Sequence, residues 1–189
     1  MEVRNKIIGD FYGGSGAWSY YYKKVGYTVA IIDILKDPAF DVRLFTPKLL
    51  GVSYFYGMLF APPCTDLAGS GARWWKNKGQ QALIEALSMV DVCFRLVWLY
   101  KPKFWALENP VGRLVHYIGK PKLIFNPCDY GDPYTKKTCL WGEFNIPKKN
   151  PVFPTGKNPI HYMPLGKERA GLRSITPSGF AKAFFESNP

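Results

Sequence analysis

The chain has 189 residues, of which 25 are basic and 14 are acidic, so its formal net charge at pH 7 is +11. This length suits one domain with a single core, and a hydrophobic fraction of 47% excludes a disordered chain. We expect a cytoplasmic protein with reduced thiols and no transmembrane segment, because the chain has four cysteines, no secretory signal and no apolar run of roughly 18–20 residues.

Short apolar runs alternate with helical patterns, which predicts an α/β fold with a largely parallel sheet flanked by helices. A first strand begins at residues 7–8, a glycine turn follows, and a helix over residues 18–25 ends at Gly26. Residues 28–32 and 55–60 are the next strands. Residues 77–100 form a long helix, since apolar residues recur at spacings of three and four, and it must end before Pro102. Residues 104–107 are a further buried strand.

Residues 143–172 have a different character, with five prolines, interspersed lysines and no periodicity, so we expect an extended basic excursion. Thr176 and Pro177 are typical of a helix start, and the helix that follows places Phe180, Ala183 and Phe184 on one face. We therefore predict one compact domain. It comprises a core over residues 1–142, the excursion over 143–172, and a C-terminal helix over 173–189 that returns to the core.

Polar or reactive residues follow four of the predicted strands. Asp10 and a glycine turn end the first strand, Asp33 follows the second, Cys64 the third and Glu108 the fourth. In an open α/β sheet, ligands bind beyond the carboxyl ends of the strands. We therefore expect these groups to meet at one edge of the sheet.

The glycine turn and Asp33 are compatible with a nucleotide-like ligand. Glycines let the backbone approach a ligand closely, but Ser19 stands where a dinucleotide motif has its third glycine, which disfavours a nicotinamide oxidoreductase. Asp33 comes 17 residues after Gly16, a spacing that suits a carboxylate on ribose hydroxyls. A structural turn and a helix cap are the alternatives.

Cys64 follows two prolines and precedes Gly69-Ser70-Gly71. A rigid thiol beside a flexible segment is typical of a nucleophile with a closing loop, although a lone cysteine is more often a small buried hydrophobe. The other cysteines and the two histidines show no metal-ligand spacing, so we expect no metal site.

Together these residues resemble the small DNA cytosine-5 methyltransferases of phages and bacteria, from Gly9 to about Ala183. The matching motifs are Asp10-Phe11-Tyr12-Gly13-Gly14-Ser15-Gly16 (Asp-Leu-Phe-x-Gly-x-Gly), Pro62-Pro63-Cys64, Glu108-Asn109-Pro110 (Glu-Asn-Val), Tyr130-Gly131-Asp132-Pro133 (Tyr-Gly-x-Pro) and Arg173-Ser174-Ile175-Thr176 (Arg-x-Leu-Thr). Pro-Pro-Cys and Glu-Asn-x in this order after a glycine loop form a specific combination.

The resemblance implies a Rossmann-like S-adenosylmethionine-dependent methyltransferase fold with S-adenosylmethionine as the cofactor. It also implies that the Cys64 thiolate adds to carbon 6 of cytosine, while Glu108 donates a proton to ring nitrogen 3. Carbon 5 then attacks the methyl sulfonium. The cytosine must leave the duplex stack to reach the thiol.

The implied site residues fall into three groups. The catalytic group is Cys64, Glu108, Pro63, Asn109, Lys136 and Lys137. The cofactor-binding group is Asp10, Tyr12, Gly13, Gly14, Ser15, Gly16, Asp33, Ile34, Asp41, Val42 and Pro62. The DNA-binding group is Ser70, Arg73, Trp74, Trp75, Arg113 and Arg173. For the two tryptophans, a hydrophobic anchor for the loop is an equal alternative.

Three departures from the family pattern bear on the substrate. Lys136 and Thr138 stand where the family has two arginines, with Lys137 as a substitute for the second. Residues 143–172 alone occupy the place of the large target-recognition domain. The last family motif, an asparagine-containing segment of the cofactor pocket, is not recognisable. A reduced recognition region offers few side chains for base edges, so we expect a short or relaxed sequence context.

The positive charge lies mainly in the second half of the chain. Residues 101–189 carry 14 basic and 6 acidic side chains, a net of +8, whereas residues 1–100 have a net of +3. On charge alone, a phosphate-rich partner and a lysine-rich solvated surface are equally open. With the motifs, we expect DNA as the partner, no membrane association and a monomer.

Two alternatives stay open. Cytosine-5 methylation of RNA or of free nucleotides would explain the missing recognition domain, while the basic second half argues for a polymer. A non-catalytic nucleic-acid-binding derivative is the other alternative, and the intact Cys64 and Glu108 argue against it.

Overall fold

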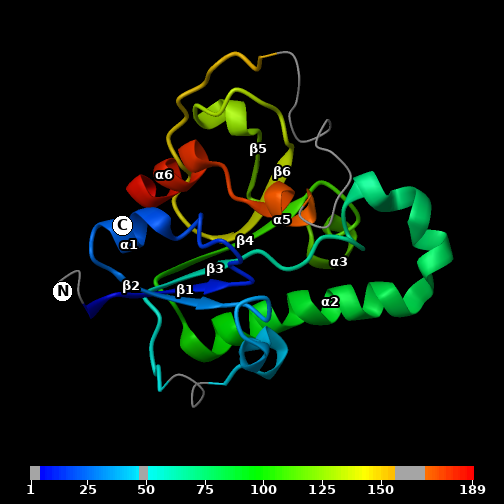
Figure 1. The fold of residues 1–189 in the computed structure, drawn as a ribbon, viewed down its shortest axis with the longest axis horizontal. Coiled ribbons are helices and arrows are strands. Elements are labelled where there is room, and N and C mark those ends of the chain that lie inside the picture. Colours follow the sequence, from blue (N-terminus) through cyan, green and yellow to red (C-terminus); the bar gives the residue numbers. More distant parts are fainter. Residues whose placement is uncertain (1–4, 47–50, 156–168) are drawn as a thin grey trace.

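The computed structural model describes residues 5–46, 51–155 and 169–189, and within them a six-stranded sheet lies between helices (Figure 1). The strands are β1 (Ile7–Phe11), β2 (Thr28–Ile32), β3 (Gly57–Phe60), β4 (Phe104–Pro110), β5 (Leu123–Phe125) and β6 (Thr138–Glu143). Their order is β2-β1-β3-β4-β6-β5. The first four strands of this order run parallel, while β6 runs antiparallel to β4 and β5. The predicted α/β class is confirmed.

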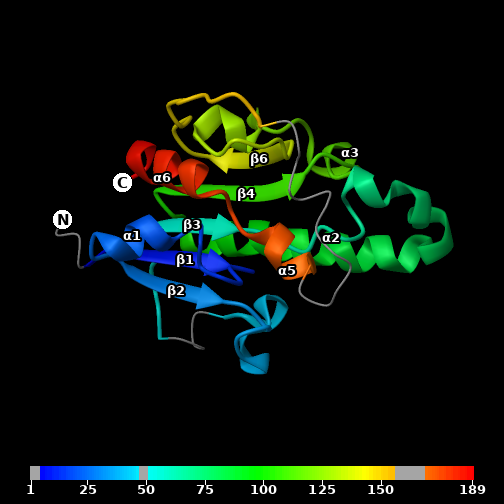
Figure 2. The ribbon, with the colours of Figure 1, turned by 45° about the horizontal axis from the view of Figure 1, so that its top comes forward.

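Helices cover both faces of the sheet (Figure 2). α1 (Tyr20–Lys24) and α6 (Ser178–Ser187) lie on one face, and α2 (Trp75–Tyr100) lies on the other. The shorter elements are α3 (Val115–Ile118), α5 (Arg169–Ser174) and the 3-10 turns η2 (Pro38–Phe40), η3 (Val42–Leu44), η4 (Gly69–Trp74) and η5 (Pro127–Tyr130). Among the described residues, no helix has both the length and the apolarity that a membrane span requires.

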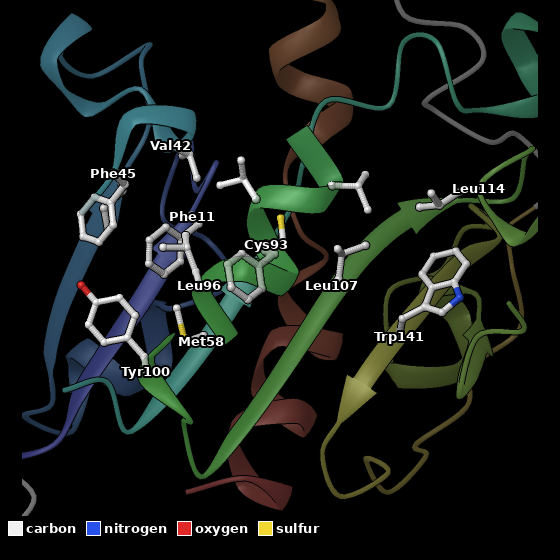
Figure 3. Close-up of a cluster of buried hydrophobic side chains, with 14 of the residues drawn as sticks. Phe11, Val42, Phe45, Met58, Cys93, Leu96, Tyr100, Leu107, Leu114 and Trp141 are labelled. Carbon is white, nitrogen blue, oxygen red and sulfur yellow. The ribbon is translucent and has the colours of Figure 1, made fainter. Parts of the chain in front are cut away.

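The core on the α2 face is built from alternate residues of the strands (Figure 3). Phe11, Met58 and Leu107 point to this face and pack with Cys93 and Leu96 of α2. Successive side chains of a strand point to opposite faces, so the residues next to these must fill the other layer.

The core on the opposite face is rich in aromatic rings. Ile8, Leu59 and Ala106 pack there with Phe180 and Phe184 of α6. All five side chains are fully buried. Because both faces are covered, the parallel strands read as continuous apolar runs, which is why the sequence predicts them.

The chain order places a topological switch point between β1 and β3. β2 lies on one side of β1, whereas β3 lies on its other side and is followed outward by β4. The loops that leave β1 and β3 therefore diverge at their carboxyl ends. In open α/β sheets, such a divergence opens the crevice in which ligands bind.

Several predicted boundaries are wrong by a few residues. The predicted helix over 18–25 shrinks to Tyr20–Lys24, with Gly26 at φ +98° after it. α2 begins two residues earlier than predicted and is broken at Gly79 (φ +73°), but it ends before Lys101 as expected. β3 starts at Gly57 rather than Phe55, which lies outside the strand and is buried in the α2-side core.

The carboxyl-terminal part of the chain also departs from expectation. Residues 144–155 have no regular structure, as predicted, but residues 169–172 belong to α5. The remainder of the predicted excursion, residues 156–168, lies outside the described residues. Pro177, not Thr176, is the residue before α6, and it makes no side-chain cap.

We expect Phe180→Ala to destabilise the fold by about 3–5 kcal/mol, because a buried aromatic ring is replaced by a cavity. Phe180 is fully buried and stacks on Phe125 with 3.9 Å between ring centroids. Urea unfolding measures the difference. Phe153→Ala is the control, since Phe153 is 94% exposed and its loss should stay within about 0.5 kcal/mol. Equal effects of the two substitutions would contradict the packing assigned to α6.

Candidate functional site

A glycine loop joins β1 to α1 at the switch point. A Cβ on Gly13 would lie 2.6 Å from Cγ of Asp10, and one on Gly16 would lie 2.7 Å from Cδ1 of Ile31. Gly16 also has φ +71°, a conformation that side chains disfavour. The loop therefore lies closer to the strands than any other residue type would allow at these two positions.

Asp10 supports this loop from beneath. Its side chain is 1% exposed, and its Oδ2 accepts a 2.5 Å hydrogen bond from the Ser19 hydroxyl. Burial, followed by the nearby Asp33, raises the pKa of Asp10 to about 6. The prediction that Asp10 contacts a cofactor is not supported by this placement, because the carboxyl group is enclosed under the loop.

Asp33 joins the ends of β1 and β2. Its Oδ2 accepts from the Gly14 N–H at 2.8 Å, and its Oδ1 accepts from the Leu35 N–H at 2.8 Å. The carboxylate is only 5% exposed, so its first role in the fold is to fix the glycine loop. Ile34 beside it is 48% exposed and Ser15 is exposed, as residues of a ligand-binding surface would be.

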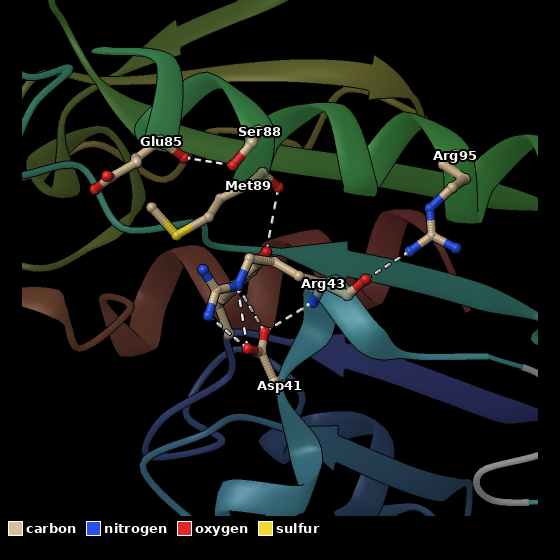
Figure 4. Close-up of polar contacts among 7 residues, drawn as sticks. Asp41, Arg43, Glu85, Ser88, Met89 and Arg95 are labelled. Carbon is tan, nitrogen blue, oxygen red and sulfur yellow. Dashed lines mark hydrogen bonds and ion pairs between the residues drawn. The ribbon is translucent and has the colours of Figure 1, made fainter. Parts of the chain in front are cut away.

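Three other predicted cofactor residues are engaged within the protein (Figure 4). Asp41 caps η3 and pairs with the Arg43 guanidinium at 2.6 Å, and this hydrogen bonding lowers the pKa of Asp41. The Tyr12 hydroxyl donates to the Met89 carbonyl of α2 at 3.2 Å. Val42 is 1% exposed in the α2-side core, so the prediction that it contacts a ligand is not supported by its position.

The ends of β3 and β4 carry the predicted nucleophile and acid. Asn109 is fully buried, and its Nδ2 donates to the carbonyl of the buried Pro62 at 3.1 Å. This contact fixes the segment before Cys64 against the strand that carries Glu108. Pro63 is exposed, and the Cys64 side chain retains partial access to solvent.

The charges around Cys64 and Glu108 are coupled. Burial raises the pKa of the Glu108 carboxyl, and the Lys136 ammonium partly offsets this. Burial and the Glu108 charge raise the pKa of the Cys64 thiol, while the cations of Lys136 and Arg173 act in the opposite direction. The ligand-free site therefore holds a protonated thiol beside a carboxyl group that retains its proton more readily than usual.

Lys136 is fixed at this site by α5. Its Nζ donates to the Arg173 carbonyl at 2.9 Å. Lys137 is exposed and acts on a different thiol, since burial raises the pKa of Cys139 to about 11 and the Lys137 charge partly offsets this. The structure thus brings Lys136 to the predicted acid and nucleophile but separates the role of Lys137 from theirs.

A short backbone seam joins the loop after Cys64 to the loop after Glu108. Ala68 and Gly112 form an antiparallel bridge, flanked by hydrogen bonds from Gly69 N–H to the Val111 carbonyl and from the Arg113 N–H to the Leu67 carbonyl, each 2.9 Å. A Cβ on Gly112 would lie 2.0 Å from the Leu67 oxygen. Only glycine permits this close approach.

The predicted DNA-binding residues divide into exposed and inward-facing sets. Ser70, Arg73 and Trp74 are exposed on η4, and Trp74 is 52% exposed. Arg113 stacks on Trp75 at 4.4 Å and donates from Nε to the Asp66 carbonyl. For Trp75 the structure favours the anchoring alternative, and Arg113 reinforces the seam.

A cavity of about 490 Å³ lies beside the glycine loop. Its walls are residues 15–17, Tyr20 and Tyr21 of α1, Asp132 and Tyr134, Leu172 of α5, and residues 175–178. Cys64 and Glu108 do not line it, but α5 connects the two places, since Leu172 lines the cavity and the Arg173 carbonyl holds Lys136. The segment before α6 thus lies across the glycine loop.

Sequence analysis assigned no ligand role to most of these cavity residues. Asp132 stands within the Tyr-Gly-Asp-Pro motif, and Thr176 ends the Arg-Ser-Ile-Thr motif, so the motifs gave a signal. Tyr20, Tyr21 and Ser178 gave none, because their approach depends on packing between α1 and α6. The hydrogen bond of 3.2 Å between the Tyr21 hydroxyl and the Ser178 hydroxyl joins these helices.

Comparison with solved structures places the fold among methyltransferases. A methyltransferase of Entamoeba histolytica has a TM-score of 0.50 and 14% identity, over 85% of this chain and 60% of that protein. A candidate DNA modification methyltransferase encoded within an E. coli prophage has a TM-score of 0.48 and 16% identity, over 79% and 53%. The chain spans less than two thirds of the length of either protein.

No protein-family model matches the chain, and no curated protein matches its sequence. The structural likeness therefore establishes the fold, a Rossmann-like methyltransferase fold, at low sequence identity.

We expect Asp10→Asn to change how stability depends on pH. The pKa of Asp10 rises from 3.8 to about 6 on folding, so the folded chain holds this proton more tightly than the unfolded chain. The stability contribution is complete below about pH 4 and is lost as the pH rises through about 6. Relative to the wild type, the Asn variant should gain about 3 kcal/mol between pH 4 and pH 7, measured by urea unfolding. A difference that does not vary with pH would contradict the assignment.

We also expect Lys136→Met to slow alkylation of Cys64 by iodoacetamide at neutral pH, because the Lys136 cation lowers the pKa of that thiol. Mass spectrometry of the Cys64 peptide measures the rate against pH. Lys137→Met is the matched control and should leave this pH profile unchanged. Identical profiles for all three proteins would refute the electrostatic role of Lys136.

Proposed function

We propose that the protein is an S-adenosylmethionine-dependent methyltransferase that modifies carbon 5 of cytosine in DNA through a covalent bond to Cys64. The sequence context of the methylated cytosine is short or relaxed. The observation that carries the proposal is the meeting of a thiol, a proton-retaining carboxyl group and a fixed ammonium at the carboxyl edge of a methyltransferase-type sheet.

The resting protonation states suit this chemistry. A carboxyl group whose pKa is raised by burial retains a proton, which Glu108 can donate to ring nitrogen 3 of the cytosine. The Cys64 thiol gives up its proton to water, and its sulfur forms a bond to carbon 6 as the carbon 5–carbon 6 double bond is displaced toward nitrogen 3. Lys136 favours both steps, since its cation stabilises thiolate and carboxylate.

The release step reverses these changes. The proton on carbon 5 leaves to a base, the bond between sulfur and carbon 6 breaks, and Glu108 recovers its proton from nitrogen 3. Asn109 acts as a positioning residue, since its amide holds Pro62 and hence the orientation of Cys64. The seam at Gly112 holds the segment on the other side of Cys64.

The chain has a place that fits the methyl donor. The cavity of about 490 Å³ is within the roughly 300–1,000 Å³ of small-molecule sites, and it adjoins a loop whose glycines allow close backbone approach. When bound, S-adenosylmethionine supplies the methyl group as an electrophilic sulfonium carbon. Ser15 and Gly16 border this cavity, while Ile34 is exposed beside Asp33 at the end of the neighbouring strand.

The charge distribution supports a nucleic acid as the other substrate. The net charge of residues 101–189 is +8, and the exposed Arg73 and Trp74 follow Cys64 in the chain. A cation stacked on an indole ring, here at 5.1 Å, offers both a phosphate partner and a stacking surface. Residues 144–155 are extended and carry few groups suited to reading base edges, so the proposed context is relaxed.

We expect Cys64→Ser to abolish transfer of a labelled methyl group to duplex DNA, because a hydroxyl is a far weaker nucleophile than a thiolate at neutral pH. Cys128→Ser is the control, since Cys128 is also partly exposed but lies in η5 away from Glu108, and it should retain full activity. Turnover by the Cys64→Ser variant would contradict the nucleophile assignment.

Parallel reactions with duplex DNA, RNA and dCMP identify the substrate. Transfer to DNA alone is expected, and bisulfite sequencing of the product should show many different flanking sequences. Transfer only to RNA or dCMP would overturn DNA as the substrate, and a long invariant site would overturn the relaxed context.

A further inference from the structure

The cavity beside the glycine loop has a charge character opposite to that of the whole protein. The chain carries a net charge of +11, yet none of the described residues that line this cavity is basic. Its single charged lining group is the carboxylate of Asp132. A phosphate would meet only repulsion from that group, whereas a cation would be attracted.

Asp132 is held rigidly at the cavity wall. Its Oδ2 accepts a hydrogen bond of 2.9 Å from the Gly179 N–H in the first turn of α6. A Cβ on Gly179 would lie 2.0 Å from the Tyr130 oxygen, so the loop that carries Asp132 and the start of α6 are in close contact. No lysine or arginine among the described residues forms an ion pair with this carboxylate.

Aromatic rings supplement this charge. Tyr20, Tyr21 and Tyr134 line the cavity together with Asp132, and the faces of tyrosine rings attract cations. Burial and the charge of Asp132 raise the pKa of Tyr134 to about 12, which indicates that the phenol and the carboxylate are close together. The phenol stays neutral at physiological pH and leaves the cavity with one negative charge.

We infer that this cavity binds the cationic amino-acid end of the methyl donor, with the Asp132 carboxylate as the partner of its α-ammonium group. This inference rests on the proposed function and adds a residue to its site. A ligand with an ammonium and a sulfonium matches a cavity that has one carboxylate and three phenols. It also separates the two substrates, since the polyanion is left to the basic residues outside the cavity.

Isothermal titration calorimetry of the full chain with three ligands tests the inference. S-Adenosylmethionine carries the ammonium and the sulfonium, S-adenosylhomocysteine keeps only the ammonium, and methylthioadenosine lacks the amino-acid end. We expect Asp132→Asn to weaken binding of the first two ligands by about tenfold or more, because a charged hydrogen bond contributes roughly 1.5–3 kcal/mol. Binding of methylthioadenosine should be unchanged.

The asparagine side chain can still accept from the Gly179 N–H, so the variant should fold, and thermal unfolding verifies this. Asp91→Asn on the exposed side of α2 is the matched charge control and should bind all three ligands like the wild type. A second test needs no change at Asp132. Tyr20→Lys adds a cation at a residue that is 53% exposed and should weaken the same two ligands, while Tyr117→Lys, at a residue 50% exposed on α3, should not.

The outcomes separate the inference from the proposed function. If the wild type binds S-adenosylmethionine but Asp132→Asn and Tyr20→Lys affect all three ligands equally or not at all, the cationic cavity is refuted and the methyl donor binds elsewhere. If the wild type does not bind S-adenosylmethionine, the proposed function itself fails.

Discussion

Burial of the sheet on both faces is the constraint on which the rest of the molecule depends. α2 covers one face and α1 and α6 cover the other, so a polar side chain in the middle of a strand would be enclosed in hydrocarbon. The polar groups gather instead where the strands end. The order of β2, β1 and β3 then opens the sheet edge at that same place, and the loops after β1 and β3 diverge around it.

Two buried polar groups pass below this edge, and each has a specific structural use. Asp10 accepts from Ser19 and lies under Gly13, while Asn109 donates to the Pro62 carbonyl. Neither contacts the proposed ligands. They convert two loops, which would otherwise be free to vary, into surfaces of fixed shape, and this is the form of support that a site with reacting groups requires.

The sequence predicts the parallel strands and α2 well, because a strand buried on both faces is a continuous apolar run and a long helix repeats its apolar residues. It does not predict β5 and β6, since β5 has only three residues, one of them the half-exposed Ile124 at the sheet edge. At the site, Cys64 and Glu108 are found from their places after strands. The inward positions of Asp10 and Val42 and the approach of Ser178 to Tyr21 are not found, because they depend on tertiary packing between distant segments.

The seam between Ala68 and Gly112 has a mechanical consequence. The loop after the thiol and the loop after the carboxyl are joined through backbone hydrogen bonds on both sides of Gly112, with no side chain that could yield between them. On the other side of Cys64, the Asn109 amide fastens Pro62. The two loops consequently move as one body. A base that enters the site would meet the sulfur and the acid at a constant spacing, whatever the motion of the exposed residues around them.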